Sequence, residues 1–345
     1  MPRLNDVFVV GLVANLPSGK YDAAGNLVQL ALPVFVVHGK RDYGERQITD
    51  SKSHKSTTQR GSSLIWILSN NEDFINEMKA CKPFDIVEAK GVIRVVPTRK
   101  KCTCPECGEV HFYDSTKTTV YPLYFSVRKS YAEKYGIESF AVGRISESLL
   151  KKVEDEAWTE VERCLEISDG IQLIGVICKE PELYQRDSDH RPMLTFPLAV
   201  KRKYFIPEAD MTVNVDFPYI KLYGKHAVEH QKTLNRANLI LVDGFINSRE
   251  IIRKISCDKC ELSYKIKELI HEIIPYSVEY IRSNISDTDF NRVDKAYRPK
   301  LIGSEADPIL TYKSPQEQSD EDVAAGRGGD GYGEDIKRIL DNMEG

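Results

Sequence analysis

The sequence has no apolar run approaching the roughly 20 residues that a helix needs to span a bilayer. Its first residues, Met-Pro-Arg-Leu-Asn-Asp, lack the apolar core of a secretory signal peptide. We therefore expect a cytoplasmic protein. Tryptophan is scarce, with two residues in 345, but 41% of residues are hydrophobic and 29% are charged. That composition excludes a chain that is disordered throughout.

Signatures of catalysis are also missing. The sequence contains no glycine loop of the kind that cradles phosphate, no His-Glu-x-x-His motif, and no pair of carboxylates beside a plausible base. We therefore expect that the protein is not an enzyme and turn to binding functions.

Residues 91–107 and 244–260 repeat each other. In each segment a glycine after an apolar run, Gly91 or Gly244, is followed 13 residues later by Cys-x-x-Cys, with a basic pair just before the cysteines. Upstream, Gly11 and Gly175 lie within matching apolar runs that are 164 residues apart. The chain therefore contains two copies of one module.

Each copy has the pattern of a small barrel. Apolar runs at 7–13, 28–37, 63–68, 86–96 and 118–127 predict five strands, and the apolar spacing at 71–79 predicts a short helix. Five strands with a helix between the third and fourth are typical of the OB-fold. We predict a mostly β protein with two tandem OB-fold barrels at 1–130 and 168–285. Between them we expect a connecting helical segment at 131–167, and after them an acidic, largely disordered tail at 286–345.

Several stretches of the second copy resemble bacterial single-stranded DNA-binding proteins. Residues 196–202 (Phe-Pro-Leu-Ala-Val-Lys-Arg) are similar to that family's second strand, residues 217–229 to its third strand and following helix, and residues 241–246 to its fourth strand. The first copy is similar at 5–11 and 91–94. The resemblance implies sequence-independent binding of single-stranded DNA in DNA replication, recombination or repair, at the nucleoid.

Such binding needs flat aromatic faces for bases and cations for the backbone. By position, the resemblance assigns stacking roles to Tyr204, Phe217 and Tyr223 in the second copy, and we add Tyr43 and Trp66 in the first. The nucleic-acid-binding cations that we expect are Arg94, Lys100, Lys101, Arg202, Lys225, Arg253 and Lys254. Alternatively, the aromatics are half-buried strand residues and the cations form an ordinary solvated surface.

The cysteines suggest zinc. A Cys-x-x-Cys hairpin tip supplies two ligands of a tetrahedral site. Cys104, Cys107, Cys257 and Cys260 would complete a site shared by the two copies, whereas Cys102 and His111 offer ligands for a local site in the first copy. The sequence leaves a shared site, a local site and no metal all open.

The acidity of the protein lies in the tail. Residues 316–345 carry nine acidic and three basic residues, so the remaining chain is slightly positive although the net charge is −4. The resemblance implies a tail that docks on replication or repair proteins, and it suggests a homodimer because related proteins assemble four barrels. A second hypothesis is a zinc-bridged scaffold in a replication complex with little direct DNA binding.

Overall fold

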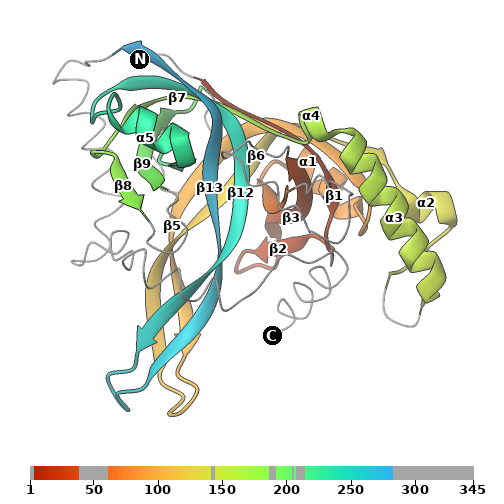
Figure 1. The fold of residues 1–345 in the computed structure, drawn as a ribbon. Coiled ribbons are helices and arrows are strands. Elements are labelled where there is room, and N and C mark those ends of the chain that lie inside the picture. Colours follow the sequence, from red (N-terminus) through yellow and green to blue (C-terminus); the bar gives the residue numbers. More distant parts are fainter. Residues whose placement is uncertain are drawn as a thin grey trace, which may run out of the picture.

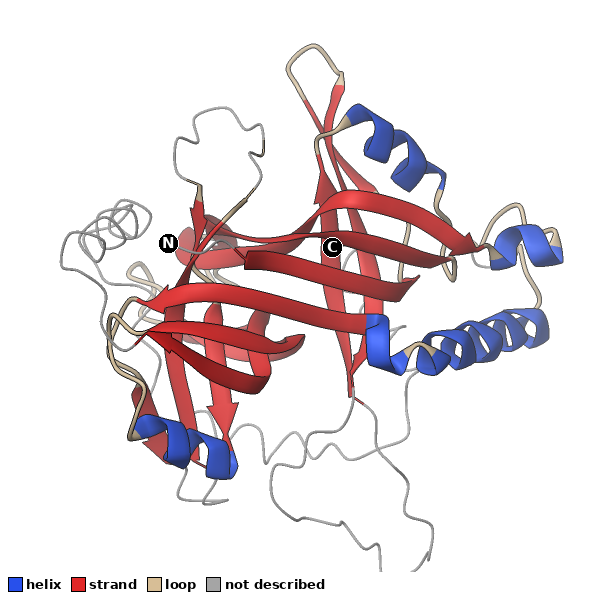
Figure 2. Ribbon diagram, turned by 90° about the horizontal axis from the view of Figure 1, so that it is seen from above, coloured by secondary structure: helices blue, strands red, loops and turns tan. Residues whose placement is uncertain are grey.

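The computed structural model describes residues 4–38, 61–140, 144–185, 192–203, 206 and 214–282. Strands dominate these residues and form one continuous sheet that curls into two barrels (Figures 1 and 2). None of the described helices has the length and apolar character of a membrane-crossing segment. The predicted acidic tail at 286–345 lies outside the described residues.

The first barrel contains five strands and a helix in the predicted order. They are β1 (Leu4–Val13), β3 (Leu27–His38), β4 (Gly61–Ser69), α1 (Glu72–Ala80), β5 (Ile86–Thr103) and β6 (Val110–Lys129). Strand β1 pairs with both β3 and β5, β5 pairs with β6, β6 lies parallel to β4, and β4 returns to β3. This circuit closes the barrel. A short strand, β2 (Ser18–Tyr21), extends β3 on the outside.

The second barrel repeats this circuit. Its elements are β7 (Asp169–Ile177), β9 (Pro192–Lys201), β11 (Tyr219–Tyr223), α5 (Gly224–Gln231), β12 (Leu239–Ser256) and β13 (Ser263–Arg282). Strand β7 pairs with β9 and β12, and β11 lies between β9 and a parallel β13. Two short strands, β8 (Glu182–Gln185) and β10 (Val215–Asp216), pair with β9. The prediction of two tandem OB-fold barrels is confirmed.

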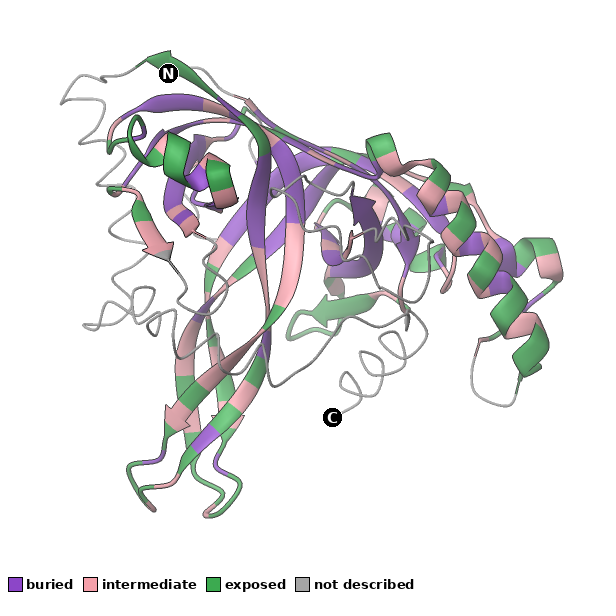
Figure 3. Ribbon diagram, in the orientation of Figure 1, coloured by how far each residue is buried: buried purple, intermediate pink, exposed green. Residues whose placement is uncertain are grey.

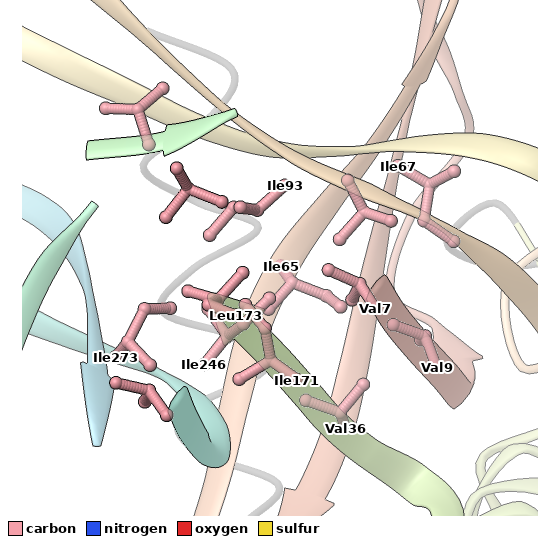
Figure 4. Packing of buried hydrophobic residues seen from close by; sticks show 14 of the residues in the cluster. Val7, Val9, Val36, Ile65, Ile67, Ile93, Ile171, Leu173, Ile246 and Ile273 are labelled. Atoms are coloured by element: carbon pink, nitrogen blue, oxygen red, sulfur yellow. The ribbon is translucent and has the colours of Figure 1, made fainter. Parts of the chain in front are cut away.

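Antiparallel pairing of β1 with β7 joins the barrels. Val7 pairs with Ile171, which is its own counterpart in the second copy, 164 residues later. The copies are therefore related by a local pseudo-two-fold axis between these residues. Apolar side chains that point inward at every second strand position, as the pleat requires, form one core cluster across both barrels (Figure 4).

The repeated glycines lie at β-bulges. The register shifts between Lys90 and Gly91 and, in the second copy, between Asp243 and Gly244. A Cβ atom on Gly91 would collide with the carbonyl oxygen of Tyr121, which explains why a residue without a side chain occupies this position. Beyond the bulges the two hairpins extend as two-stranded ribbons whose tips lie side by side (Figure 1).

We call residues 96–117 the first arm and residues 249–270 the second arm. The strands that form them are longer than predicted, because cross-strand pairing continues to Thr103 and Val110 in one hairpin and to Ser256 and Ser263 in the other. The arms are less buried than the barrels (Figure 3). The apolar pattern did not predict this continuation, because polar residues alternate with apolar ones along the arms.

The connecting segment is helical but broken into three pieces: α2 (Tyr131–Tyr135), α3 (Glu147–Arg163) and α4 (Leu165–Ser168). The long helix begins only at Glu147, within the predicted segment 131–167, where the Ser146 hydroxyl caps it by accepting from the N–H of Leu149. Val153, Ala157 and Val161 of α3 pack on the outside of the first barrel. Trp158 is part of the same contact and lies against Phe35.

Candidate metal centre and nucleic-acid interface

The two arm tips bring four cysteines together. The Sγ atoms of Cys104 and Cys260 are 3.6 Å apart, those of Cys107 and Cys257 are 3.5 Å apart, and all four lie within 4.8 Å of one another. Tetrahedral zinc with Zn–S bonds of about 2.3 Å would separate its sulfur ligands by about 3.8 Å. The sulfur arrangement therefore fits one ion between the arms.

Matching turns present these sulfurs. The N–H of Cys104 donates to the carbonyl of Glu109, and the N–H of Cys257 donates to that of Leu262. Each turn ends in a left-handed residue, at Gly108 (φ 69°) and at its counterpart Glu261 (φ 57°). Loss of solvent raises the pKa of the Cys257 thiol, but donors including the backbone N–H groups of Cys260 and Lys259 lower it to about 6. These donors favour the thiolate form of Cys257, whereas the pKa of Cys260, which the N–H of Leu262 lowers, is raised overall to about 12 by burial and by hydrogen bonds with the other three sulfurs.

Neither alternative ligand belongs to this group of four sulfurs, although the His111 side chain hydrogen-bonds to Cys257. Cys102 sits one residue pair behind the tip, with its sulfur 3.7 Å from the carbonyl oxygen of His111 and 3.4 Å from the hydroxyl of Tyr264. His111 pairs with Cys102 across the first arm. Among the described residues, the four-cysteine group therefore draws equally on the two copies.

Between the tips and the barrels, Glu268 holds the arms together. Its carboxylate, 1% exposed, accepts from Lys100 Nζ of the first arm at 2.9 Å, and it also contacts Arg253 and Ser115. Lys100 and Arg253 are counterparts in the two copies, as are Ser115 and Glu268. Burial alone raises the pKa of Glu268, but its contacts with Ser115, Lys100 and Arg253 outweigh burial and lower that pKa. Two of the predicted DNA-binding cations thus share one carboxylate: Lys100 reaches Glu268 from the first arm, and Arg253 contacts it within the second arm.

Other predicted site residues are buried. Arg202 forms an ion pair with Asp216 at 2.8 Å, and Asp216 also accepts from the N–H of Val95 in the first copy at 2.9 Å. Arg94 is 3% exposed and Phe217 is 6% exposed. Phe217 packs against Cys178 and Ala199, which is the half-buried alternative that the sequence left open.

A second buried carboxylate lies on the outer face of the second barrel. Glu272 accepts from Lys221 at 2.6 Å and from Arg249 at 3.0 Å, and Tyr223 and Asn247 also donate to it. Burial raises the pKa of Glu272, whereas Lys221 and Arg249 lower it, and the net shift is downward. Sequence reasoning missed this network, whose only signal was a pair of acids four residues apart, Glu268 and Glu272, among apolar and basic residues in the first half of β13.

The remaining predicted residues differ in accessibility. Lys101 and Lys254 are exposed, and the Lys225 side chain is 82% exposed with a loose pair to Glu229 at 3.5 Å. Trp66 is partly exposed on the outer face of β4. Tyr43 and Tyr204 lie outside the described residues.

The comparisons with known proteins point to one family for the second copy. Residues 169–269 match the model of the single-strand binding protein family. That stretch runs from the start of β7 into the second arm. No curated protein matches the chain.

Two solved structures are similar to the chain. One is the wild-type single-stranded DNA-binding protein from Thermus aquaticus, with a TM-score of 0.47 and 11% identity over 81% of this chain and 94% of that chain. The other is a deletion mutant of the Thermus aquaticus protein, with a TM-score of 0.43 and 12% identity over 83% of this chain and 99% of that chain.

Proposed function

We propose that this protein binds single-stranded DNA without sequence preference. The observation that carries the proposal is the match of residues 169–269 to the single-strand binding protein family, over a segment that forms most of the second OB barrel. OB barrels commonly bind oligonucleotides on one outer face and in the adjoining loops. A family of binding proteins also supports a role without catalysis.

The contacts would be stacking on partly exposed aromatics and neutralisation of phosphates by exposed cations. Trp66 and Tyr223 are the described aromatics from the predicted set that keep some exposure, and Lys101, Lys225 and Lys254 are the exposed cations. Lys100, Arg202 and Arg253 would act by shaping the surface, because their charges are engaged within the protein.

One zinc ion held by Cys104, Cys107, Cys257 and Cys260 belongs to the same proposal. The sulfur separations and the N–H donors around Cys257 support it. The ion would supply no chemistry beyond a crosslink, locking the two arms, and through them the two barrels, in one orientation. Metal analysis should find one zinc per chain, and Cys257→Ser should remove it while Cys102→Ser should not.

In the cell we place the activity in the cytoplasm, at the nucleoid, in DNA replication, recombination or repair, where the protein would protect exposed strands. Recruitment of partner proteins by the acidic tail and assembly into a homodimer are further parts of the proposal. They depend on residues 286–345 and on a second chain, so pull-down with a tail-deleted chain and light scattering are their tests.

The test of DNA binding is a fluorescence anisotropy titration with a labelled dT oligonucleotide at two salt concentrations. Binding should weaken as salt rises, because each phosphate neutralised releases counterions. A duplex of the same length is the control and should bind less tightly.

A second candidate function is a zinc-bridged scaffold with little DNA binding. The observation that favours it is that several cations expected to contact DNA already have carboxylate partners within the protein. Arg202 pairs with Asp216, and Lys100 and Arg253 pair with Glu268. A protein that contains zinc but does not bind the dT oligonucleotide at low salt would select this alternative.

A further inference from the structure

The pseudo-two-fold relation lets the outer faces of the two barrels be compared residue by residue. Lys20 pairs with Gln29 as Tyr184 pairs with Met193, which relates these strands at an offset of 164. Ile67 pairs with Val120 as Ile220 pairs with Ile273, which relates β4 to β11 and β6 to β13 at an offset of 153. The faces that flank these strands are therefore structural equivalents.

The face of the first barrel exposes an aromatic ring between cations. Ile65 and Ile67 lie in the core, so Trp66 points outward on β4. On β6, Val120 lies in the core, so Thr119 and Lys117 point outward. Trp66, Lys117 and Thr119 therefore share one face.

Lys20 reaches this face from the neighbouring edge. Leu30 and Leu32 of β3 lie in the core, so Gln29 points outward, and Lys20 lies directly opposite Gln29. Among the described residues, neither Lys20 nor Lys117 forms an ion pair. Burial lowers the pKa of Lys117, and so does the positive potential of the nearby cations Lys100, Arg94 and Lys20. Positive charge is therefore concentrated around Lys117.

The equivalent face of the second barrel has a different charge pattern. Tyr184 and Ile270 replace Lys20 and Lys117, and Glu272 replaces Thr119. Glu272 binds two of the cations that this face does have, Lys221 and Arg249. Glu182 adds a second acid where the first copy has Ser18. The cations that this face adds are Lys221, Arg249 and Lys201, in place of Leu68, Val96 and Val37.

We propose that the two barrels contribute unequally to DNA binding. The outer face of the first barrel, with Trp66 between Lys20 and Lys117, holds the backbone of the unpaired strand. The second barrel contributes less positive charge to binding. This inference rests on the proposed function. It assigns the main binding surface to the copy outside the segment that matches the family model.

The experiment compares charge-matched variants of the full chain by dT anisotropy over a salt series. Lys20→Ala with Lys117→Ala should lower the slope of log affinity against log salt by about 1.4, because each single-strand phosphate contact contributes about 0.7. Lys151→Ala with Lys232→Ala removes the same charge from exposed positions on α3 and at the end of α5, so its slope should stay at the wild-type value.

Trp66→Ala tests stacking on the same face. It should weaken binding about 5-fold to 150-fold, the range that corresponds to 1–3 kcal/mol for a stacked base, and Trp66→Phe should restore most of the loss. Circular dichroism melting shows whether each variant is folded. Because the two lysines are on the surface, their double variant gives a result even if Trp66→Ala unfolds.

The outcomes separate this inference from the proposed function. Wild-type protein that fails to bind dT at low salt would refute both. A second outcome would overturn only the assignment of the main binding surface to the first barrel. In that outcome the first-barrel variants bind as the wild type does, and Lys225→Ala with Lys254→Ala lowers the salt slope instead. DNA binding itself would then still stand.

Discussion

Asp169→Asn should stabilise the protein, and by an amount that grows with pH. Asp169 is the counterpart of Asn5, and each side chain bonds the backbone of the neighbouring strand, β12 for Asp169 and β5 for Asn5. The amide of Asn5 makes two hydrogen bonds to Ile93, one accepted at 2.8 Å and one donated at 3.1 Å. The carboxyl of Asp169 accepts one from the N–H of Ile246 at 3.1 Å, and its second oxygen has no hydrogen-bond partner among the described residues.

Burial raises the pKa of Asp169 to about 8 from an ordinary value of 3.8, although the Ile246 N–H opposes the shift. The folded protein therefore holds a proton on Asp169 up to about pH 8, which the unfolded chain releases above about pH 4. Stability is then lost as pH rises through this window and levels off above it. At about 1.4 kcal/mol per pH unit, the loss at pH 6 is on the order of 3 kcal/mol.

The assay is urea unfolding followed by circular dichroism at pH 5, 6, 7 and 8. Asp169→Asn removes the titration and supplies the amide donor that Asn5 has, so its advantage over wild type should widen at each step. Asn5→Asp is the matched variant and should introduce the same pH dependence into the first copy. Parallel wild-type and Asp169→Asn curves across this range would refute the reasoning.

Three further changes have defined expected outcomes. Glu268→Ala should lower the free energy of unfolding, measured in urea, by about 2–3 kcal/mol, because it leaves two partly buried cations without the carboxylate that accepts their charge-assisted hydrogen bonds. Glu268→Gln should lower it less. Glu261→Gly should raise the free energy of unfolding by about 1 kcal/mol, because glycine adopts the left-handed conformation without strain, and an unchanged value would show that the turn is unstrained. Gly91→Ala should destabilise the first barrel by about 1–3 kcal/mol, and wild-type stability would contradict the close approach to Tyr121.

Much of the architecture could be predicted because the same module occurs twice in the chain. The glycines at fixed offsets, such as Gly91 and Gly244, revealed the repeat, and the apolar runs located the barrel strands. The inward-facing residues repeat with period two over several positions, and that is the signal that sequence shows best. The clustering of Cys104 and Cys107 with Cys257 and Cys260 was one of the alternatives that the repeat left open, since equivalent hairpins about a pseudo-two-fold axis can bring their tips together.

The roles of individual cations could not be predicted in the same way. Sequence does not show that Lys100 and Arg253 both contact the Glu268 carboxylate. Lys100 is 168 positions from Glu268 in the chain, and Arg253 is 15 positions from it. Nor does it show that Arg202 is buried against Asp216, since a basic residue at a strand end looks the same whether paired or solvated. Charge placement across an interface depends on the packing of the copies, which composition and periodicity do not encode.

The most direct test of the account is the affinity of the 345-residue chain for a labelled dT oligonucleotide, measured by anisotropy at low salt and again at high salt. The account predicts saturable binding at low salt that weakens steadily as salt is added. Absence of binding at low salt, by a protein that is folded and contains zinc, would contradict it.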